Sequence, residues 1–203
     1  MIINFYGNQF IKLQVGDTTL ALDPFKGTKF GADVVLQSTL HEDMSAGPDL
    51  FYGNKVPHIV KGPGEYEIKG IFIKGYEAYT NYDGIDNATG TTYYTFEFDG
   101  IRILFLGALG KNDKKVTIDS DIDMVFIPIS GDGRLSAKEA AAFLNDIDCK
   151  AIIPMGFKDV SDKCVQDFIK EIGADTKTEV QDKLTIKKKE LDGADQRLYI
   201  IKS

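Results

Sequence analysis

The feature that most constrains the fold is a series of short apolar segments separated by turn residues. The first four segments, IINF, FIKLQV, TTLAL and ADVVL, lie within residues 2–36. Short segments rich in Val, Ile and Thr are typical of β-strands. Gly16-Asp17 indicates a tight turn between the second and third segments, and Pro24 ends the third because proline lacks an amide donor. The chain is therefore predicted to begin as an antiparallel β-meander.

The middle of the chain continues the series of predicted strands. VPHIV, EYEI and GIFIKGY follow the loop QSTLHEDMSAGPD, and Gly62-Pro63-Gly64 forces a turn between the first two of these segments. TTYYTFEF and IRILFLG flank Asp99-Gly100. An Asp-Gly pair suits the type I′ turn, which needs positive φ at both central residues, so a hairpin is predicted here.

In the last third, predicted helices alternate with predicted strands. DMVFIPI and CKAIIPM are predicted strands, and LSAKEAAAFLNDI is a predicted helix with Ser136 as its N-cap. A second, amphipathic helix is predicted over Ser161–Ile172, ending before Gly173. KLTIKKKEL and RLYIIKS are predicted to close the chain as strands. The chain therefore ends with β-α-β units.

These elements predict an α/β (α+β) fold in one domain. With 203 residues and 43% hydrophobic content, the chain can bury a sizeable core within a single domain over residues 1–203. Two sheets would bury their apolar strands face to face, with helices packed outside them. The predicted architecture is a four-layer αββα sandwich.

Charge and composition narrow the classes of partner. A formal net charge of -7 and a pI near 4.9 provide no basic field for phosphate backbones, so nucleic-acid binding is disfavoured. Lys187, Lys188 and Lys189 are interpreted as a solvated edge strand. No signal-peptide pattern or membrane-length apolar run is found, which predicts a cytoplasmic protein that does not insert into membranes. Cys149 and Cys164 are expected to be free thiols.

Five longer segments resemble one known superfamily in the same order along the chain. They are INFYGNQFIKLQVGDTTLALDPF, VKGPGEYEIKGIFIKGYEA, FEFDGIRILFLGALG, DMVFIPISG and KAIIPMGF. Together they resemble the metallo-β-lactamase superfamily, and within it the small bacterial hydrolase-like proteins similar to ascorbate-6-phosphate lactonase. The resemblance covers nearly the whole chain and implies the same four-layer sandwich.

The resemblance also implies where a metal would bind. The family's loop after the fourth strand reads His-x-His-x-Asp-His. The corresponding positions here are Thr39, His41, Asp43 and Met44, so the second His and the Asp are kept and the two outer ligands are replaced.

The family's three later ligands are also replaced. A His, an Asp and a final His of the family correspond here to Thr80, Ala108 and Gly156. No histidine follows His58, which lies in a predicted strand, so a histidine-rich binuclear site cannot form within one molecule. We therefore expect a degenerate metal site with no bound metal and no cofactor.

Some polar residues near the expected cleft keep an alternative open. If the protein is active, His41 and Asp43 are the candidate catalytic residues, with zinc or manganese as the metal. Asp23 and Glu65 are further residues that could line the cleft. Otherwise Asp43 would accept backbone amides or pair with His41, which satisfies both side chains without a metal.

Two functions of different class follow. The first is a pseudoenzyme, a non-catalytic binding or assembly module that recognises a small molecule or another protein, with homo-oligomerisation also open. The alternative is a metal-dependent hydrolase-like enzyme with residual or altered activity on lactone or phosphoester substrates. Fold alone does not choose between them.

Overall fold

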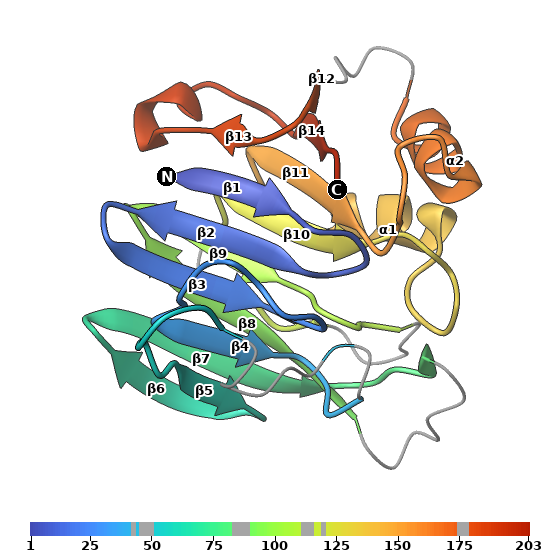
Figure 1. Cartoon of the computed structure of the whole chain (residues 1–203). Helices are drawn as coiled ribbons and strands as arrows, with labels where there is room; N and C mark the ends of the chain where they lie inside the picture. Colours follow the sequence, from blue (N-terminus) through green and yellow to red (C-terminus); the bar gives the residue numbers. More distant parts are fainter. Residues whose placement is uncertain (42–43, 45–50, 83–89, 111–115, 119–120, 174–178) are drawn as a thin grey trace.

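Two β-sheets lie face to face in the computed structural model, and both α-helices lie beside the second sheet (Figure 1). The structure describes residues 1–41, 44, 51–82, 90–110, 116–118, 121–173 and 179–203.

The first sheet has the strand order β13-β1-β2-β3-β4-β5. Its strands are β1 (Ile2–Phe5), β2 (Ile11–Val15), β3 (Thr18–Leu22), β4 (Val34–Gln37), β5 (His58–Lys61) and β13 (Leu184–Thr185). β1, β2 and β3 form the predicted antiparallel meander, whereas β3, β4 and β5 run parallel. The carboxyl ends of β3, β4 and β5 therefore lie at the same edge of the sheet.

The second sheet has the strand order β12-β14-β11-β10-β9-β8-β7-β6. Its strands are β6 (Gly64–Ile68), β7 (Ile71–Ala78), β8 (Thr91–Phe98), β9 (Ile101–Phe105), β10 (Met124–Pro128), β11 (Ala151–Met155), β12 (Glu179–Gln181) and β14 (Arg197–Ile201). The strands from β6 to β9 are antiparallel, and β9, β10, β11, β14 and β12 are parallel. Asp99 and Gly100 join β8 to β9 with φ of 57° and 69°, as the predicted hairpin requires.

The two helices form close to where the sequence predicts them. α1 (Ala137–Leu144) begins at the predicted N-cap Ser136, which forms a capping box with Glu139. α2 (Lys163–Glu171) lies within its predicted range and packs against α1, which in turn contacts β10. Both helices follow parallel strands, as expected of β-α-β units.

The inner faces of the two sheets share one apolar core. β10 and β11 are buried along their whole length, which is typical of central parallel strands covered on both faces. A second apolar cluster lies on the outer face of the first sheet. Its buried members are Phe10, Ala21, Ala32, Val35 and Phe51. The predicted α/β sandwich is confirmed; in the described residues, aromatic side chains of connecting segments cover this outer face.

One predicted strand is wrong over part of its length. In KLTIKKKEL only Leu184–Thr185 pairs as a strand, and Lys188–Glu190 form a 3-10 helix instead. The Nζ of Lys188 forms a salt bridge with the buried carboxylate of Asp123, which draws this lysine inward. An ion pair between a half-exposed lysine and a buried carboxylate thus replaces the solvated strand edge that the lysine run suggested.

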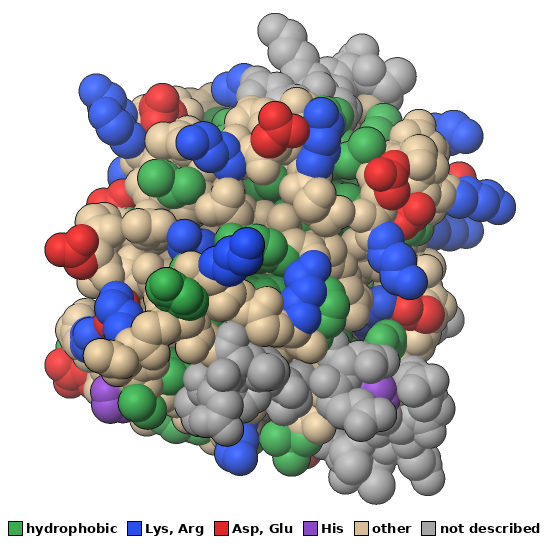
Figure 2. All heavy atoms as spheres, in the orientation of Figure 1, with side chains coloured by type: hydrophobic (Ala, Val, Ile, Leu, Met, Phe, Trp, Pro, Cys, Tyr) green, Lys and Arg blue, Asp and Glu red, His purple; other side chains and the backbone are tan. Residues whose placement is uncertain are grey.

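The surface carries mixed charge. On the face shown in Figure 2, acidic and basic side chains are interspersed, with apolar side chains among them. Among the described residues, none of the helices has the length and apolar character needed to cross a membrane.

Candidate functional site

Segments that follow the carboxyl ends of β3, β4, β7, β9, β10 and β11 meet at one edge of the sandwich, called the site edge below. Backbone hydrogen bonds connect them: the Gly110 amide donates to Tyr79 O at 2.8 Å and the Asn81 amide to Gly133 O at 3.1 Å. The segment after β11 is tied to the loop between β1 and β2, because the Asn8 amide donates to Phe157 O at 2.8 Å. The fold therefore brings together residues that are far apart in the sequence.

Asp23 is the buried centre of this edge. Its side chain is fully buried, and both carboxylate oxygens accept hydrogen bonds from Ser38. The Ser38 amide donates to Oδ1 at 2.6 Å and the Ser38 hydroxyl to Oδ2 at 2.5 Å. Burial raises the pKa of Asp23 to about 7, although the Ser38 hydrogen bonds and the charge of Arg134 act in the opposite direction. These residues form the Asp23 node.

Gly107 closes the Asp23 node from the second sheet. It follows β9 with φ of 52°, and a Cβ at this position would lie 2.1 Å from Ser38 Cβ. Only glycine permits this approach. The next residue, Ala108, donates its amide to Ser38 Oγ at 3.1 Å, and buried Gln9 donates to Gly107 O at 2.5 Å. The buried Ser38 hydroxyl thus donates to Asp23 and accepts from the Ala108 amide, which argues against a role as nucleophile.

The loop after β4 places the sequence-predicted residues as follows. Thr39 and Met44 are buried, and Thr39 Oγ1 accepts the His41 amide at 3.3 Å. The half-buried His41 ring lies edge-on to the Tyr82 ring, with centroids 5.1 Å apart. Asp43, the other candidate catalytic residue, lies outside the described residues, so its predicted pairing with His41 is untested.

The three later positions of the family's ligand set also lie at the site edge. Thr80 is buried, and its Oγ1 accepts the Tyr82 amide at 3.2 Å. Ala108 is buried against Ser38. Gly156 has φ of 92°, and its amide donates to Asn8 O at 2.5 Å. The fold therefore places all three at the same edge as His41.

Arg134 lies at this edge and was not among the sequence-predicted residues. Its side chain is buried, its Nε and Nη2 donate to the two Asp132 carboxylate oxygens at 2.7 and 2.5 Å, and its Nη1 donates to Asn8 Oδ1 at 2.5 Å. Its guanidinium also stacks over the Tyr82 ring, 4.6 Å from the centroid. In the sequence, Arg134 lies between a glycine turn and the start of a predicted helix. An arginine at such a position usually faces solvent, so its burial could not be predicted from the sequence.

The described side chains at the site edge do not fit a catalytic metal ion. A catalytic zinc usually takes about three protein ligands. In the part of the chain that the structure describes, no group of three or more His, Cys, Asp or Glu side chains could hold a metal. Both oxygens of Asp23 already accept hydrogen bonds, and the buried guanidinium of Arg134 adds a fixed positive charge that repels a further cation.

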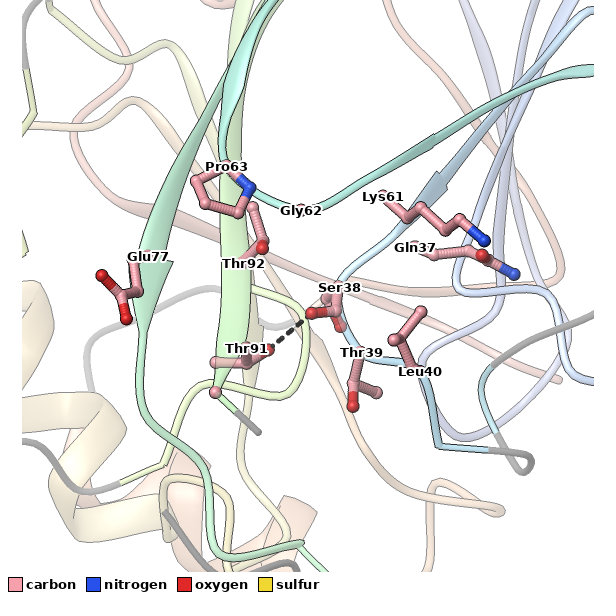
Figure 3. Close-up of a pocket in the computed structure, with 11 residues that line it drawn as sticks. Gln37, Ser38, Thr39, Leu40, Lys61, Gly62, Pro63, Glu77, Thr91 and Thr92 are labelled. Atoms are coloured by element: carbon pink, nitrogen blue, oxygen red, sulfur yellow. Dashed lines mark hydrogen bonds between the residues drawn. The ribbon is translucent and has the colours of Figure 1, made fainter. Parts of the chain in front are cut away.

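A cavity of about 410 Å³, called the edge cavity below, opens beside the site edge (Figure 3). It is lined by the ends of β4, β5, β7 and β8, namely Gln37, Ser38, Thr39, Leu40, Lys61, Gly62, Pro63, Glu77, Gly90, Thr91 and Thr92. Lys61 and Glu77 lie on opposite sides of it, with threonines between them (Figure 3). The Thr91 hydroxyl donates to Ser38 O at 3.0 Å, which ties the cavity wall to the Asp23 node. The lining is polar and carries both signs of charge.

The strands that carry Glu65 and His58 determine where these two side chains lie. Glu65 does not line the edge cavity: it is exposed on β6, and its carboxylate lies 3.3 Å from Lys74 Nζ on β7. The register of β6 with β7 places it opposite Lys74, and its expected place along the cleft stays a prediction. His58 lies on β5 and is exposed, in the strand where it was predicted.

The two facing mixed sheets and the polar edge at their strand ends define a metallo-β-lactamase-type sandwich. Residues 2–156 match the sequence profile of the β-lactamase superfamily domain, and the chain belongs to that family.

Solved structures support the same assignment. A protein from Thermotoga maritima, described as a candidate zinc-dependent hydrolase of the metallo-β-lactamase superfamily, is 26% identical with a TM-score of 0.75, over 99% of this chain and 98% of that one. A candidate metal-dependent hydrolase from Parabacteroides distasonis is 16% identical with a TM-score of 0.66, over 97% and 91% of the two chains. The second likeness shows the fold alone. A comparison with curated protein sequences finds no match.

Proposed function

We propose that this protein is a non-catalytic member of the β-lactamase superfamily that binds a small polar molecule in the edge cavity. The observation that carries the proposal is the edge cavity itself, with its threonines and its opposed Lys61 and Glu77 beside the substituted ligand positions. A volume of about 410 Å³ lies within the range of small-molecule sites. Polar lining of both signs favours a ligand with hydroxyl or charged groups.

The chemistry of the neighbouring residues supports a binding role over a hydrolytic one. Activating water needs a metal or a general base with a free lone pair that faces the substrate. Asp23, the buried acid of the site edge, directs both oxygens to Ser38. The substituted positions Thr39, Thr80, Ala108 and Gly156 offer no base of their own.

A second candidate function is a metal-dependent hydrolase with altered activity on lactone or phosphoester substrates. It is favoured by the similarity to the Thermotoga maritima protein, which is described as a candidate zinc-dependent hydrolase. On this account His41 and Asp43 would bind zinc or manganese and support catalysis. The site would need additional ligands that the described residues do not supply.

A hydrolysis screen separates the two functions. Wild-type protein, supplemented with zinc or manganese, is tested on esters, lactones and phosphodiesters alongside His41→Ala and the control His58→Ala, which alters the exposed histidine on β5. We expect all three proteins to show only background rates. Metal-dependent hydrolysis that His41→Ala abolishes and His58→Ala retains would establish the second function.

Ligand binding is tested by thermal shift against sugars, sugar phosphates, amino acids and small carboxylic acids. We expect at least one of these to raise the Tm of the wild type. The rise should shrink in Lys61→Met and Glu77→Gln, which remove the two charged side chains among the lining residues of the edge cavity, and persist in Lys187→Met, which alters an exposed lysine outside it. A rise that Lys61→Met and Glu77→Gln leave intact would place the ligand elsewhere.

We further propose a cytoplasmic location for this module. Cys149 is buried and Cys164 is half-buried, and both are free thiols, which suits a reducing compartment. Burial raises the pKa of Cys149 to about 12, so this thiol is kept in its unreactive form. A protein partner or a second copy of the chain stays part of the proposal, and light scattering after size-exclusion chromatography would measure the subunit number.

A further inference from the structure

We infer that the guanidinium of Arg134 replaces a metal cation at the site edge, as the positive charge that holds its loops together. In a metal-binding relative, one cation cross-links residues from several loops through its ligands. In this chain Arg134 also connects several loops, through hydrogen bonds and ring stacking. The inference goes beyond the proposed function, because it concerns what holds the edge together and needs no ligand in the edge cavity.

The contacts of Arg134 come from three separate segments. Asp132 lies two residues before it, Tyr82 follows β7, and Asn8 lies in the loop between β1 and β2, at a separation of 126 residues. A buried side chain with two paired donors and a stacked aromatic face is fixed in position, unlike a solvated arginine. Arg134 therefore joins both sheets at one point.

The residues that contact Arg134 also contact positions that correspond to the family's metal ligands. Tyr82 packs edge-on against His41 and donates its amide to Thr80 Oγ1. Asn8, whose side chain accepts from Arg134, accepts the Gly156 amide through its backbone carbonyl. Three of the positions that correspond to the family's metal ligands, His41, Thr80 and Gly156, thus contact a residue that contacts the guanidinium.

The charges at this edge are arranged around the guanidinium. Arg134 and Asp132 form a bidentate pair, and Arg134 also acts electrostatically on the buried Asp23 carboxyl. Burial alone would raise the pKa of Asp132, but the hydrogen bonds from Arg134 and Ser130 hold this pKa below its usual value. A permanently charged group thus compensates Asp132 and offsets a small part of the burial penalty of Asp23.

The test compares substitutions that keep or remove the positive charge. Arg134→Lys keeps it, and Arg134→Gln removes it but keeps some hydrogen-bonding capacity. Arg197→Gln is the matched control, since Arg197 is an exposed arginine that stacks on Tyr199 with its guanidinium 5.2 Å from the ring centroid. Tm is measured by differential scanning calorimetry for each protein, untreated, with EDTA and with added zinc.

We expect Arg134→Gln to lower the Tm by on the order of 10 °C and Arg197→Gln by less than about 2 °C. Arg134→Lys should recover part of the loss. Neither EDTA nor zinc should change the Tm of the wild type.

Three outcomes would overturn the inference. They are a loss in Arg134→Gln no larger than in the control, a loss in Arg134→Lys equal to that in Arg134→Gln, and a wild-type Tm that zinc raises and EDTA lowers. If the substituted proteins do not accumulate, the zinc and EDTA measurements on the wild type still decide. Failure of the two substitution tests would leave the ligand-binding proposal intact, because the thermal shifts at Lys61 and Glu77 test it separately.

Discussion

Two of the buried aspartates, Asp23 and Asp123, lie at opposite edges of the sandwich and have different kinds of partner. Asp123 precedes β10, at the amino ends of the parallel strands, and Asp23 follows β3 at the site edge. Lysines and an arginine surround Asp123, whereas the hydrogen bonds to Asp23 come from the neutral groups of Ser38. The two edges therefore stabilise their buried acids with different partners: cations at Asp123 and neutral hydrogen-bond donors at Asp23.

Asp123 is the centre of a charged cluster. Lys150 Nζ lies 2.9 Å from one carboxylate oxygen, Lys188 pairs with the other, and the Arg102 amide donates at 2.8 Å. Burial alone would raise the pKa of Asp123, but these partners lower it to about 2. The cluster ties the starts of β9, β10 and β11 to the 3-10 helix near the C-terminus.

Asp23 shows what burial does without contacting cations. Its pKa is raised to about 7, chiefly by burial, while the Ser38 hydrogen bonds only partly offset the penalty. The pKa values of the two carboxyls therefore move in opposite directions, because Asp23 is more deeply buried and because Asp123 has cationic partners. At the site edge, Asp23 therefore lies among hydroxyl and amide groups, while the buried guanidinium of Arg134 pairs with Asp132 instead.

The largest expected effect comes from removing the acid of the charged cluster. Asp123→Asn leaves Lys150, Lys188 and Arg102 without the buried carboxylate that they share, which should lower the free energy of unfolding by about 3 kcal/mol. Urea unfolding followed by fluorescence or circular dichroism measures the change. Asp121→Asn is the control, because Asp121 is 90% exposed and pairs with the same arginine at 3.4 Å. Equal losses in both variants would mean that burial of the acid does not matter.

The next effect concerns the close approach that shapes the Asp23 node. Gly107→Ala would bring a Cβ to 2.1 Å from Ser38 Cβ and push Ser38 away from Asp23. We expect a loss of stability of about 3 kcal/mol, from steric overlap together with positive φ. Gly100→Ala is the matched control, with φ of 69° and nothing within 4 Å of the added Cβ, so it should cost only about 1 kcal/mol. If Gly100→Ala lost as much stability as Gly107→Ala, the loss would come from the positive φ alone and not from overlap with Ser38.

The smallest effect is a difference in pH dependence between the two aspartates. The folded pKa of Asp23, about 7, lies above its ordinary value of 3.8, so its contribution is complete below 3.8 and is lost as pH rises through 7. The folded pKa of Asp123, about 2, lies below 3.8, so its contribution is present above 3.8 and is lost as pH falls through 2.

Asp23→Asn should therefore flatten the fall in stability between pH 4 and 7, by on the order of 2 kcal/mol. Urea midpoints of wild type and Asp23→Asn at several pH values test this. Parallel curves for the two proteins would show that Asp23 does not titrate in this range.

Much of the fold can be predicted from the sequence because local chemistry determines it. The Asp99-Gly100 turn, the capping box at Ser136 and the apolar strands are recognisable from neighbouring residues alone. The lysine run Lys187–Lys189 misleads for the opposite reason. Lys188 leaves the predicted strand to reach Asp123, 65 residues away, and no local pattern contains that contact.

The site edge is predictable only in part. The resemblance indicates where Thr39, Ala108 and Gly156 should lie, and the fold brings them to one edge. Arg134 could not be found in this way, because its role depends on Asn8 and Tyr82, which reach it only when both sheets are in place. The position of Glu65 likewise depends on the register of β6 with β7, which places it opposite Lys74.

The most direct test of the account is a calorimetric titration of the wild type with zinc, after metal removal by EDTA and dialysis. Arg134 pairs with Asp132, and both oxygens of Asp23 accept hydrogen bonds from Ser38, so the described residues leave no set of ligands for a divalent cation. We therefore expect no saturable heat at micromolar zinc and no zinc retained after desalting. One equivalent of tightly bound zinc, lost on His41→Ala, would contradict this expectation.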